Sequence, residues 1–167
     1  MSQSLESRLE SRLETLEARL LELEDRAAIM QLIATYGPAA DTCSQGVIAG
    51  LWTDNGIYSV VGTATYEGKA AVGALVENAT HQDYVRRGCS HVMAMPHIVI
   101  DGDRAVATGY SQVFARDGDY WRVDRASANR WELVRTPDGW RVAARYNHLM
   151  DGSESSRDLL RQVVAPA

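Results

Sequence analysis

A seven-residue hydrophobic repeat dominates the first part of the chain. Within residues 4–34, leucines recur in two interleaved series, and glutamate and arginine fill the positions between them. A repeat of this kind with charged flanks predicts one long helix with an apolar stripe. The stripe fits a helix that lies on its own domain or one that also packs on a neighbouring subunit, and its length favours the second. The two series are Leu9, Leu16, Leu23 and Met30, and Leu13, Leu20 and Ala27.

Shorter elements follow this helix in the first half of the chain. Gly37-Pro38 should interrupt the helix, because proline lacks an N–H donor and restricts the residue before it. A second short helix is expected over 39–51, followed by the turn signal Asp54-Asn55-Gly56. The β-branched run 57–61 predicts a strand, and the alanine-containing range 68–85 predicts a helix.

The second half of the chain has the pattern of an antiparallel sheet. Its strand-length runs are separated by Asp-Gly pairs, which are strong hairpin signals between β-prone segments. Helices followed by a four-strand meander indicate an α+β fold with helices on one face of a curved sheet. Residues 153–164 predict a short helix or a tail. The four runs are 89–100, 104–115, 120–134 and 140–150, with Asp-Gly pairs at 101–102, 117–118 and 138–139.

Length and composition fit one ordinary globular domain. The chain has 167 residues, of which 46% are apolar and 23% are charged, enough to bury a sizeable core. Its net charge of −5 gives no electrostatic reason to bind nucleic acid or an anionic membrane surface. Neither a signal-peptide pattern nor an apolar run of membrane-spanning length stands out. We therefore expect a cytoplasmic protein without nucleic-acid or membrane partners.

Motifs for cofactors and metals are missing from the sequence. The glycines do not have the spacing of a dinucleotide-binding loop, and neither a zinc-type His/Cys set nor a Gly-x-Ser-x-Gly elbow occurs. Cys43 and Cys89 lack metal or redox spacing, and two thiols in a reducing cytosol are favoured over a disulfide. We therefore expect no cofactor and no metal.

Strand alternation places three histidines on apolar faces of the predicted sheet, and one of them, His97, is expected to be structural or at the rim because it lies near a hairpin turn. His91, Met93 and Met95 share one face of their run, and His148 lies on the apolar face of the last run. Such a histidine is either a hydrogen-bonded core residue or a catalytic one. His81, near a helix end, is expected in solvent or on a lid.

Asp41 stands among small and apolar neighbours. One interpretation is a helix N-cap after the proline, where aspartate is favoured. The other is a carboxylate with a chemical role. Tyr36 has a similar pair of interpretations, as a core aromatic residue with a hydrogen-bonded hydroxyl or as a donor to a substrate.

The order of Tyr36, Asp41 and His91 is shared with a known group of enzymes. The bile-acid dehydratases have a tyrosine five residues before an aspartate, as Tyr36 stands before Asp41, and a histidine five residues before a proline, as His91 stands before Pro96. Over about residues 22–150 the chain resembles the SnoaL-like, nuclear-transport-factor-2-like superfamily, in its dehydratase branch, which includes scytalone dehydratase. The stretch that resembles hexachlorocyclohexane dehydrochlorinase comprises Arg26-Ala27-Ala28-Ile29, Asp41, Trp52, Asp54 and Thr65-Tyr66-x-Gly68, with His91 at nearly the family spacing.

The resemblance implies a cone-shaped barrel, in which a curved, mostly antiparallel sheet wraps around N-terminal helices. It divides the chain into a heptad-helix extension over 1–21, a SnoaL-like α+β barrel domain over 22–152, and a tail or short helix over 153–167. It also implies that Asp41 and His91 form a working pair in an apolar pocket. Resemblance to the dehydratases favours a homotrimer, and the isomerase branch leaves a dimer open.

The chain also departs from these relatives. The dehydrochlorinases lack a tyrosine at the position of Tyr36, so the chain leans toward the dehydratases. The second central histidine of scytalone dehydratase has no secure counterpart in this chain. Asn129 lies near the strand where that histidine would be expected, and His148 on the last strand could only be a substitute for it. Strand parity and the implied pocket together predict which residues bind the substrate or line the pocket. For each of them, plain packing in the core is the alternative. The residues are Trp52, Met93, Met95, Trp121, Asn129 and His148.

Together with the resemblance to the dehydratases, these residues predict a cofactor-independent lyase. His91 would take a proton from a substrate carbon, and Asp41 would hold the ring and stabilise the imidazolium that forms. Tyr36 and Tyr58 would donate to the departing oxygen, so that water is eliminated from a hydrophobic, steroid-like or polyketide-like molecule. Two kinds of alternative stay open: a ketosteroid-isomerase-like isomerase or a polyketide cyclase on the same barrel, and a non-catalytic binding or assembly module.

Overall fold

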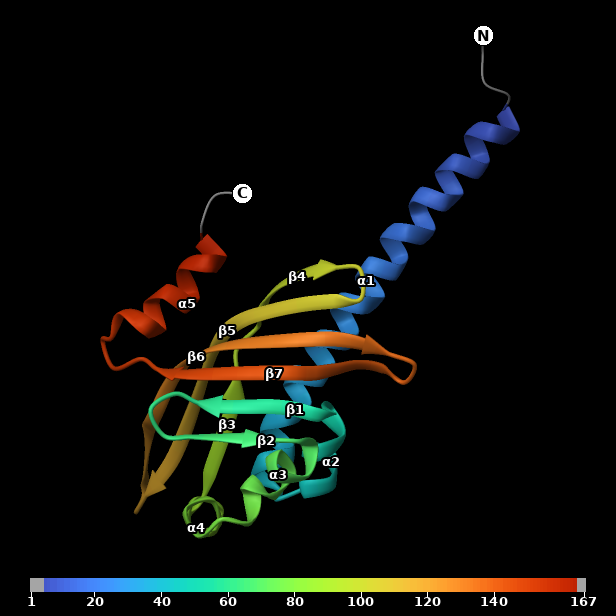
Figure 1. The fold of residues 1–167 in the computed structure, drawn as a ribbon. Helices are drawn as coiled ribbons and strands as arrows, with labels where there is room; N and C mark the ends of the chain where they lie inside the picture. The colour runs from blue at the N-terminus through green and yellow to red at the C-terminus, as the bar shows by residue number, and fades with distance from the viewer. Residues whose placement is uncertain (1–4, 165–167) are drawn as a thin grey trace.

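A curved sheet packed against helices from the first half of the chain forms the body of the protein (Figure 1). The computed structural model describes residues 5–164. The predicted α+β fold, with a curved and mostly antiparallel sheet around N-terminal helices, is confirmed, and the sheet stays open rather than closing into a barrel. Residues 1–4 of the predicted N-terminal extension and 165–167 of the predicted C-terminal segment lie outside the described residues.

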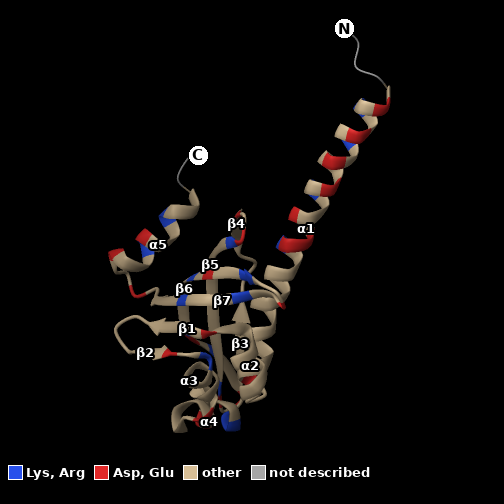
Figure 2. Cartoon of the chain, turned by 45° about the vertical axis from the view of Figure 1, so that its right-hand side comes forward, with Lys and Arg blue, Asp and Glu red and all other residues tan. Residues whose placement is uncertain are grey.

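The longest helix, α1 (Leu5–Asp41), runs through the predicted break at Gly37-Pro38. That prediction is wrong because packing of the helix end overrides the local signal of the proline. A Cβ on Gly37 would lie 2.1 Å from the carbonyl oxygen of His91, so the missing side chain lets α1 lie directly against strand β3 (Cys89–Met93). The first half of α1 instead extends beyond the sheet and carries both acidic and basic residues (Figure 2).

Short elements connect α1 to β3. The predicted helix over 68–85 is divided, because Asn78 adopts an extended conformation and its side chain accepts a 2.8 Å hydrogen bond from the N–H of His81, which starts a new helix. Among the described residues, no helix is both long enough and apolar enough to cross a membrane. The connecting elements are α2 (Gln45–Leu51), β1 (Trp52–Val60), β2 (Ala64–Glu67), α3 (Lys69–Gly73), the 3-10 helix η1 (Ala74–Glu77) and α4 (Ala79–Arg87).

The strands are arranged in the order β2-β1-β7-β6-β5-β3, and β4 also pairs with β5. The described pairs are antiparallel apart from β1 with β7, which is parallel. The predicted Asp-Gly turns join β4 to β5, β5 to β6 and β6 to β7, so these hairpins are confirmed. Helix α5 packs on the last three strands. The remaining elements are β4 (His97–Asp101), β5 (Arg104–Asp117), β6 (Tyr120–Thr136), β7 (Gly139–Leu149) and α5 (Glu154–Val164).

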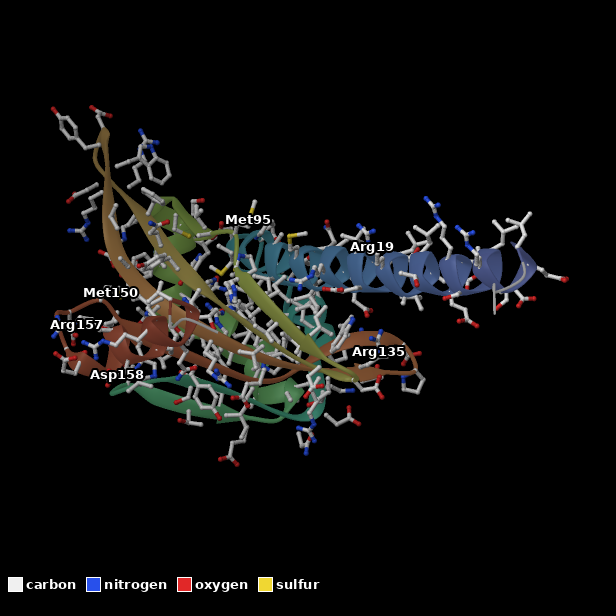
Figure 3. All side chains as sticks on the ribbon, turned by 90° about the horizontal axis from the view of Figure 1, so that it is seen from above. Arg19, Met95, Arg135, Met150, Arg157 and Asp158 are labelled. Atoms are coloured by element: carbon white, nitrogen blue, oxygen red, sulfur yellow. The ribbon has the colours of Figure 1, made fainter. Side chains whose placement is uncertain are left out.

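One extra residue between β3 and β4 reverses the faces of the run that was predicted as a single strand. Met93 lies opposite Ser111 and His97 opposite Thr108, so the β3–β4 segment is one residue longer than β5 between these pairs. Met95 therefore falls in the connection, where it is 86% exposed and points outward (Figure 3). Contrary to the prediction, it does not line the cavity described below.

A bulge in β7 reverses its faces in the same way. Val142 and Ala144 lie opposite adjacent residues of β6, so one residue of β7 is extra. Beyond the bulge, Arg145 and Asn147 are the buried residues that point toward the interior of the sheet. His148 therefore lies on the opposite face, although simple alternation along the strand predicts it on the inner one.

Aromatic rings fill the space between α1 and the sheet. Tyr36 lies edge-on to Trp52, Tyr58 and Trp131, with ring centroids 5.8–6.3 Å apart. Such pairs add favourable interactions to the burial of apolar area. Trp52, which was predicted to bind the substrate, belongs to this buried cluster.

Candidate active site

Asp41 and His91 form the centre of the candidate site. The Nδ1 of His91 lies 2.6 Å from Oδ1 of Asp41, and the side chains are 10% and 24% exposed, respectively. The backbone N–H of His91 donates to the same carboxylate, 3.0 Å from Oδ2, and the thiol of Cys89 donates to Oδ1 at 3.4 Å. Because a carboxylate accepts, it fixes the imidazole with its proton on Nδ1 and leaves Nε2 free to act as a base.

The alternative role of Asp41 as a helix N-cap is contradicted. Asp41 is the last residue of α1, and Ser44 occupies the N-cap position of α2. A carboxylate at the C-terminal end of a helix interacts unfavourably with the helix dipole. Hydrogen-bond donors on β3 compensate for the unfavourable interaction of the carboxylate with the helix dipole. The carboxylate therefore serves as an acceptor for His91 and not as a helix cap.

The protonation states of this group follow from its surroundings. Partial burial raises the pKa of Asp41, but hydrogen bonds from the ring and backbone N–H of His91 outweigh it and hold the pKa of that carboxyl below its usual value. Burial, together with the neighbouring carboxylate, raises the pKa of the Cys89 thiol to about 12. At neutral pH, Asp41 is therefore charged and Cys89 is a protonated donor.

The same three side chains offer a set of donor atoms for a metal. Atoms of Asp41, Cys89 and His91 lie within 4.8 Å of one another. A metal would have to displace the proton of the thiol and the Nδ1 proton that Asp41 accepts. The raised pKa of the thiol opposes this, so the arrangement fits a hydrogen-bonded acid–base group better than a metal centre.

A cavity of about 560 Å³ lies beside the His91 ring. This volume is in the range that holds a small organic molecule. Tyr36 and Tyr58 line it together with His91, whereas Asp41 lies behind the ring and does not line it. Apolar side chains complete much of the wall, including Val60, Leu75, Val76, Val113 and Leu149.

Tyr36 is a protonated donor at the wall of the cavity. Like Tyr58, it is almost completely buried. Burial raises the pKa of Tyr36, the neighbouring Tyr58 raises it further, and the positive charge of Arg145 opposes these effects in part. The net upward shift keeps the Tyr36 hydroxyl protonated at neutral pH.

Arg145 is a buried cation that the sequence analysis missed. Its guanidinium carbon lies 4.3 Å from the ring centroid of Tyr36, 4.6 Å from that of Tyr58 and 4.1 Å from that of Trp131. Its Nε and Nη2 donate to Oδ1 of Asn129 at 3.0 and 2.8 Å, while Nη1 has no hydrogen-bond partner among the described residues. A cation without a carboxylate partner behind two tyrosines raises the local positive potential.

His81 is the second residue that was missed. Its Nε2–H donates to the carbonyl oxygen of Ala40 at 2.9 Å, and its ring lies 5.4 Å from that of His91. Burial and the neighbouring His91 lower the pKa of His81, against the opposing effect of the bond to Ala40. It lines the cavity as a neutral ring instead of lying in solvent. The hydrogen bond that its backbone N–H donates to the side chain of Asn78, at the start of α4, places it there.

The other predicted substrate-binding residues lie away from the cavity wall. Asn129 is buried behind it as the acceptor for Arg145, and Met93 lies with its sulfur 3.8 Å from Nη2 of the same arginine. Trp121 is 57% exposed near the tip of the β5–β6 hairpin. His148 lies on the opposite face of β7. Of the residues predicted to be catalytic, the structure brings Asp41, His91, Tyr36 and Tyr58 together around one cavity.

Comparison with known proteins identifies the family. Residues 21–146 match the SnoaL-like domain, and none of the curated proteins matches the chain. An NTF2-like protein with a cystatin-like fold from Novosphingobium aromaticivorans is 44% identical, with a TM-score of 0.87 over 89% of this chain and 96% of that one.

Two dehydrochlorinase structures have the same fold at lower identity. Hexachlorocyclohexane dehydrochlorinase LinA-type3 from Novosphingobium barchaimii is 21% identical, with a TM-score of 0.68 over 79% of this chain and 90% of that one. LinA is 22% identical, with a TM-score of 0.69 over 78% and 89%. The matched residues, which include both Asp41 and His91, show that the chain belongs to the SnoaL-like domain family.

Proposed function

We propose that this protein is a cofactor-independent lyase that eliminates water from a hydrophobic small molecule. The observation that carries the proposal is the 2.6 Å contact between Asp41 and His91, with the imidazole in the wall of a cavity of about 560 Å³ and the carboxylate behind it. A carboxylate in this position orients the ring and stabilises the imidazolium, as in hydrolase triads.

The proposed reaction begins with proton transfer from carbon. Nε2 of His91 takes the proton from a carbon next to an activating group, and the electron pair forms a double bond to the adjacent carbon. The C–O bond on that carbon breaks, and Tyr36 or Tyr58 protonates the leaving hydroxide to give water. Transfer of the imidazolium proton to the tyrosinate through solvent restores both groups. Each positioned acid or base contributes a factor of about 10²–10⁴.

The surroundings of the tyrosines support this role. The guanidinium of Arg145 lies within 4.6 Å of both ring centroids. Negative charge that develops on either hydroxyl is therefore stabilised by a fixed, buried cation, which needs no rearrangement during the reaction. Asn129 holds the guanidinium from the other side.

The likeness to dehydrochlorinases supports elimination as the reaction class. A dehydrochlorinase, by its name, removes the elements of hydrogen chloride, which is also loss of a proton and an adjacent leaving group. An isomerase with an aspartate base fits less well, because Asp41 does not line the cavity. A polyketide cyclase would use the same histidine base. Its product would show ring closure without loss of water, which distinguishes it from a lyase.

The test is turnover of hydrophobic β-hydroxy ketones and thioesters in D₂O. Absorbance of the conjugated product reports elimination, and NMR reports deuterium incorporation at the acidic carbon. We expect both from the wild-type protein and neither from His91→Gln, with His97→Gln as the control because His97 is an exposed histidine.

Two outcomes would count against the proposal. A folded His91→Gln variant that keeps the rate within about threefold of wild type contradicts a histidine base, which is worth far more. Deuterium incorporation with isomerisation or ring closure but without loss of water replaces the lyase by the corresponding alternative.

A further inference from the structure

The first half of α1 does not pack against the rest of the domain. Its buried residues begin at Ile29, and the segment before it extends away from the sheet (Figures 1 and 3). Most of the stability of a helix in a protein comes from packing of its apolar face, and an exposed apolar stripe indicates an interaction site. The leucines of this segment are 50–71% exposed, namely Leu5, Leu9, Leu13, Leu16, Leu20, Leu21 and Leu23.

The protein's own sheet occupies a different face of α1. Nη1 of Arg26 donates to the carbonyl oxygen of Ile98 at 2.8 Å, and Oδ1 of Asp25 accepts from Trp140 Nε1 at 2.9 Å. With Ile29, these residues define the side of the helix that faces the sheet. The seven-residue repeat continues on another side, so the domain does not cover it.

The repeat defines a coiled-coil seam. Leu13, Leu20 and Ala27 take the a positions of the heptad, and Leu9, Leu16, Leu23 and Met30 take the d positions. Ala27 and Met30 are exposed like the leucines, so the seam continues from the projecting segment to the edge of the domain. Leu21 is exposed as well but lies outside the seam, at a b position.

The charges beside the seam are segregated by sign. Glutamate occupies successive e positions, and arginine occupies successive g positions. Among the described residues, Arg12, Glu17, Arg19 and Glu24 take part in no ion pair within the chain, so each is available to a partner. The e positions are Glu10, Glu17 and Glu24, and the g positions are Arg12, Arg19 and Arg26.

This segregation selects one orientation of a self-associated helix. In a parallel pair, a g residue of one helix lies beside the following e residue of the other, so Arg12 meets Glu17 and Arg19 meets Glu24 in both directions. In an antiparallel pair, g faces g and e faces e, which places arginine against arginine and glutamate against glutamate. The parallel arrangement is attractive throughout, and the antiparallel one is repulsive.

We infer that α1 binds α1 of a second copy of this chain as a parallel coiled coil along the seam Leu9–Met30. The two sheets then lie on the outer sides, because each occupies the side of α1 that Arg26 and Ile29 define. The inference does not depend on the proposed enzymatic function.

The decisive test is disulfide cross-linking of Leu9→Cys in the full chain. In a parallel coil the two substituted residues face each other within disulfide reach, whereas in an antiparallel overlap of the seam they lie about 30 Å apart. Leu21→Cys is the matched control, since Leu21 is equally exposed but lies off the seam. The wild-type chain, which keeps Cys43 and Cys89, sets the background.

We expect mild oxidation to link Leu9→Cys into covalent dimers at least about tenfold faster than Leu21→Cys. Adding Leu16→Glu to the Leu9→Cys variant should abolish this difference in the rate of cross-linking. Reversing Glu17 and Glu24 to arginine should slow the linkage, and reversing Arg12 and Arg19 to glutamate in the same chain should restore it. Equal rates for Leu9→Cys and Leu21→Cys overturn the inference.

Discussion

Replacing Asp41 by asparagine removes one charge from the site and little volume. The asparagine oxygen can still accept from the backbone N–H of His91, so α1 stays joined to β3. The contact to Nδ1 changes, because an amide N–H directed at Nδ1 makes that nitrogen an acceptor and moves the ring proton to Nε2. A protonated Nε2 cannot take a proton from a substrate.

The size of each effect can be worked from these contacts. The wrong tautomer should lower the turnover rate by about 10³–10⁴-fold, the scale seen when the carboxylate of a hydrolase triad is replaced by an amide. Exchange of a charge-assisted hydrogen bond for a neutral one should lower the free energy of unfolding by about 1–2 kcal/mol. In a chain of this size, that corresponds to a decrease in Tm of roughly 2–8 °C.

The assay compares initial rates and urea unfolding curves of Asp41→Asn with those of Asp54→Asn. Asp54 forms an exposed ion pair with Lys69 at 2.5 Å, so its substitution removes a similar charge at little cost. A folded Asp41→Asn variant with a rate within about tenfold of wild type would refute the reasoning, because a positioning carboxylate is worth more.

Three further predictions follow from other contacts. Gly37→Ala should destabilise the protein by about 1–3 kcal/mol in urea unfolding, because the new Cβ meets the carbonyl oxygen of His91. Gly50→Ala is the control and should not destabilise it, because a Cβ there has nothing within 4 Å. Equal stability of the two variants contradicts the packing described. Arg145→Met should lower the turnover rate at least about tenfold with little change in Tm, because it replaces an unpaired buried cation by an apolar side chain; an unchanged rate excludes a role in charge stabilisation. The folded-state pKa of His81 is lowered, so its contribution to stability is complete above the unfolded pKa of about 6.5 and is lost as the pH falls through that value toward the folded pKa. His81→Gln should therefore flatten the fall in unfolding free energy between about pH 7 and 5, and an unchanged slope contradicts this assignment.

The parts of the structure that local sequence signals determine were predictable. The Asp-Gly pairs gave the hairpins of β4 to β7, and the heptad repeat gave α1. The pairing of Asp41 with His91 came from resemblance, because no local pattern brings residues on separate elements together.

The remaining parts depend on tertiary contacts. The continuation of α1 through Pro38 depends on the close approach at Gly37. The inward position of Arg145 depends on a bulge, which adds one residue to β7 without any mark in the alternation of side chains. For the same reason strand parity placed Met95 and His148 inward. His81 was missed because the capping of α4 by Asn78 determines its direction.

The tautomer of His91 tests the account most directly and needs no substrate. Long-range ¹H–¹⁵N NMR at about pH 8.5, where an ordinary histidine is neutral, distinguishes a protonated ring nitrogen from a bare one. We predict a proton on Nδ1 and none on Nε2 in the wild-type protein, and loss of this pattern in Asp41→Asn. A proton on Nε2 in the wild-type protein would contradict the assignment of His91 as the base.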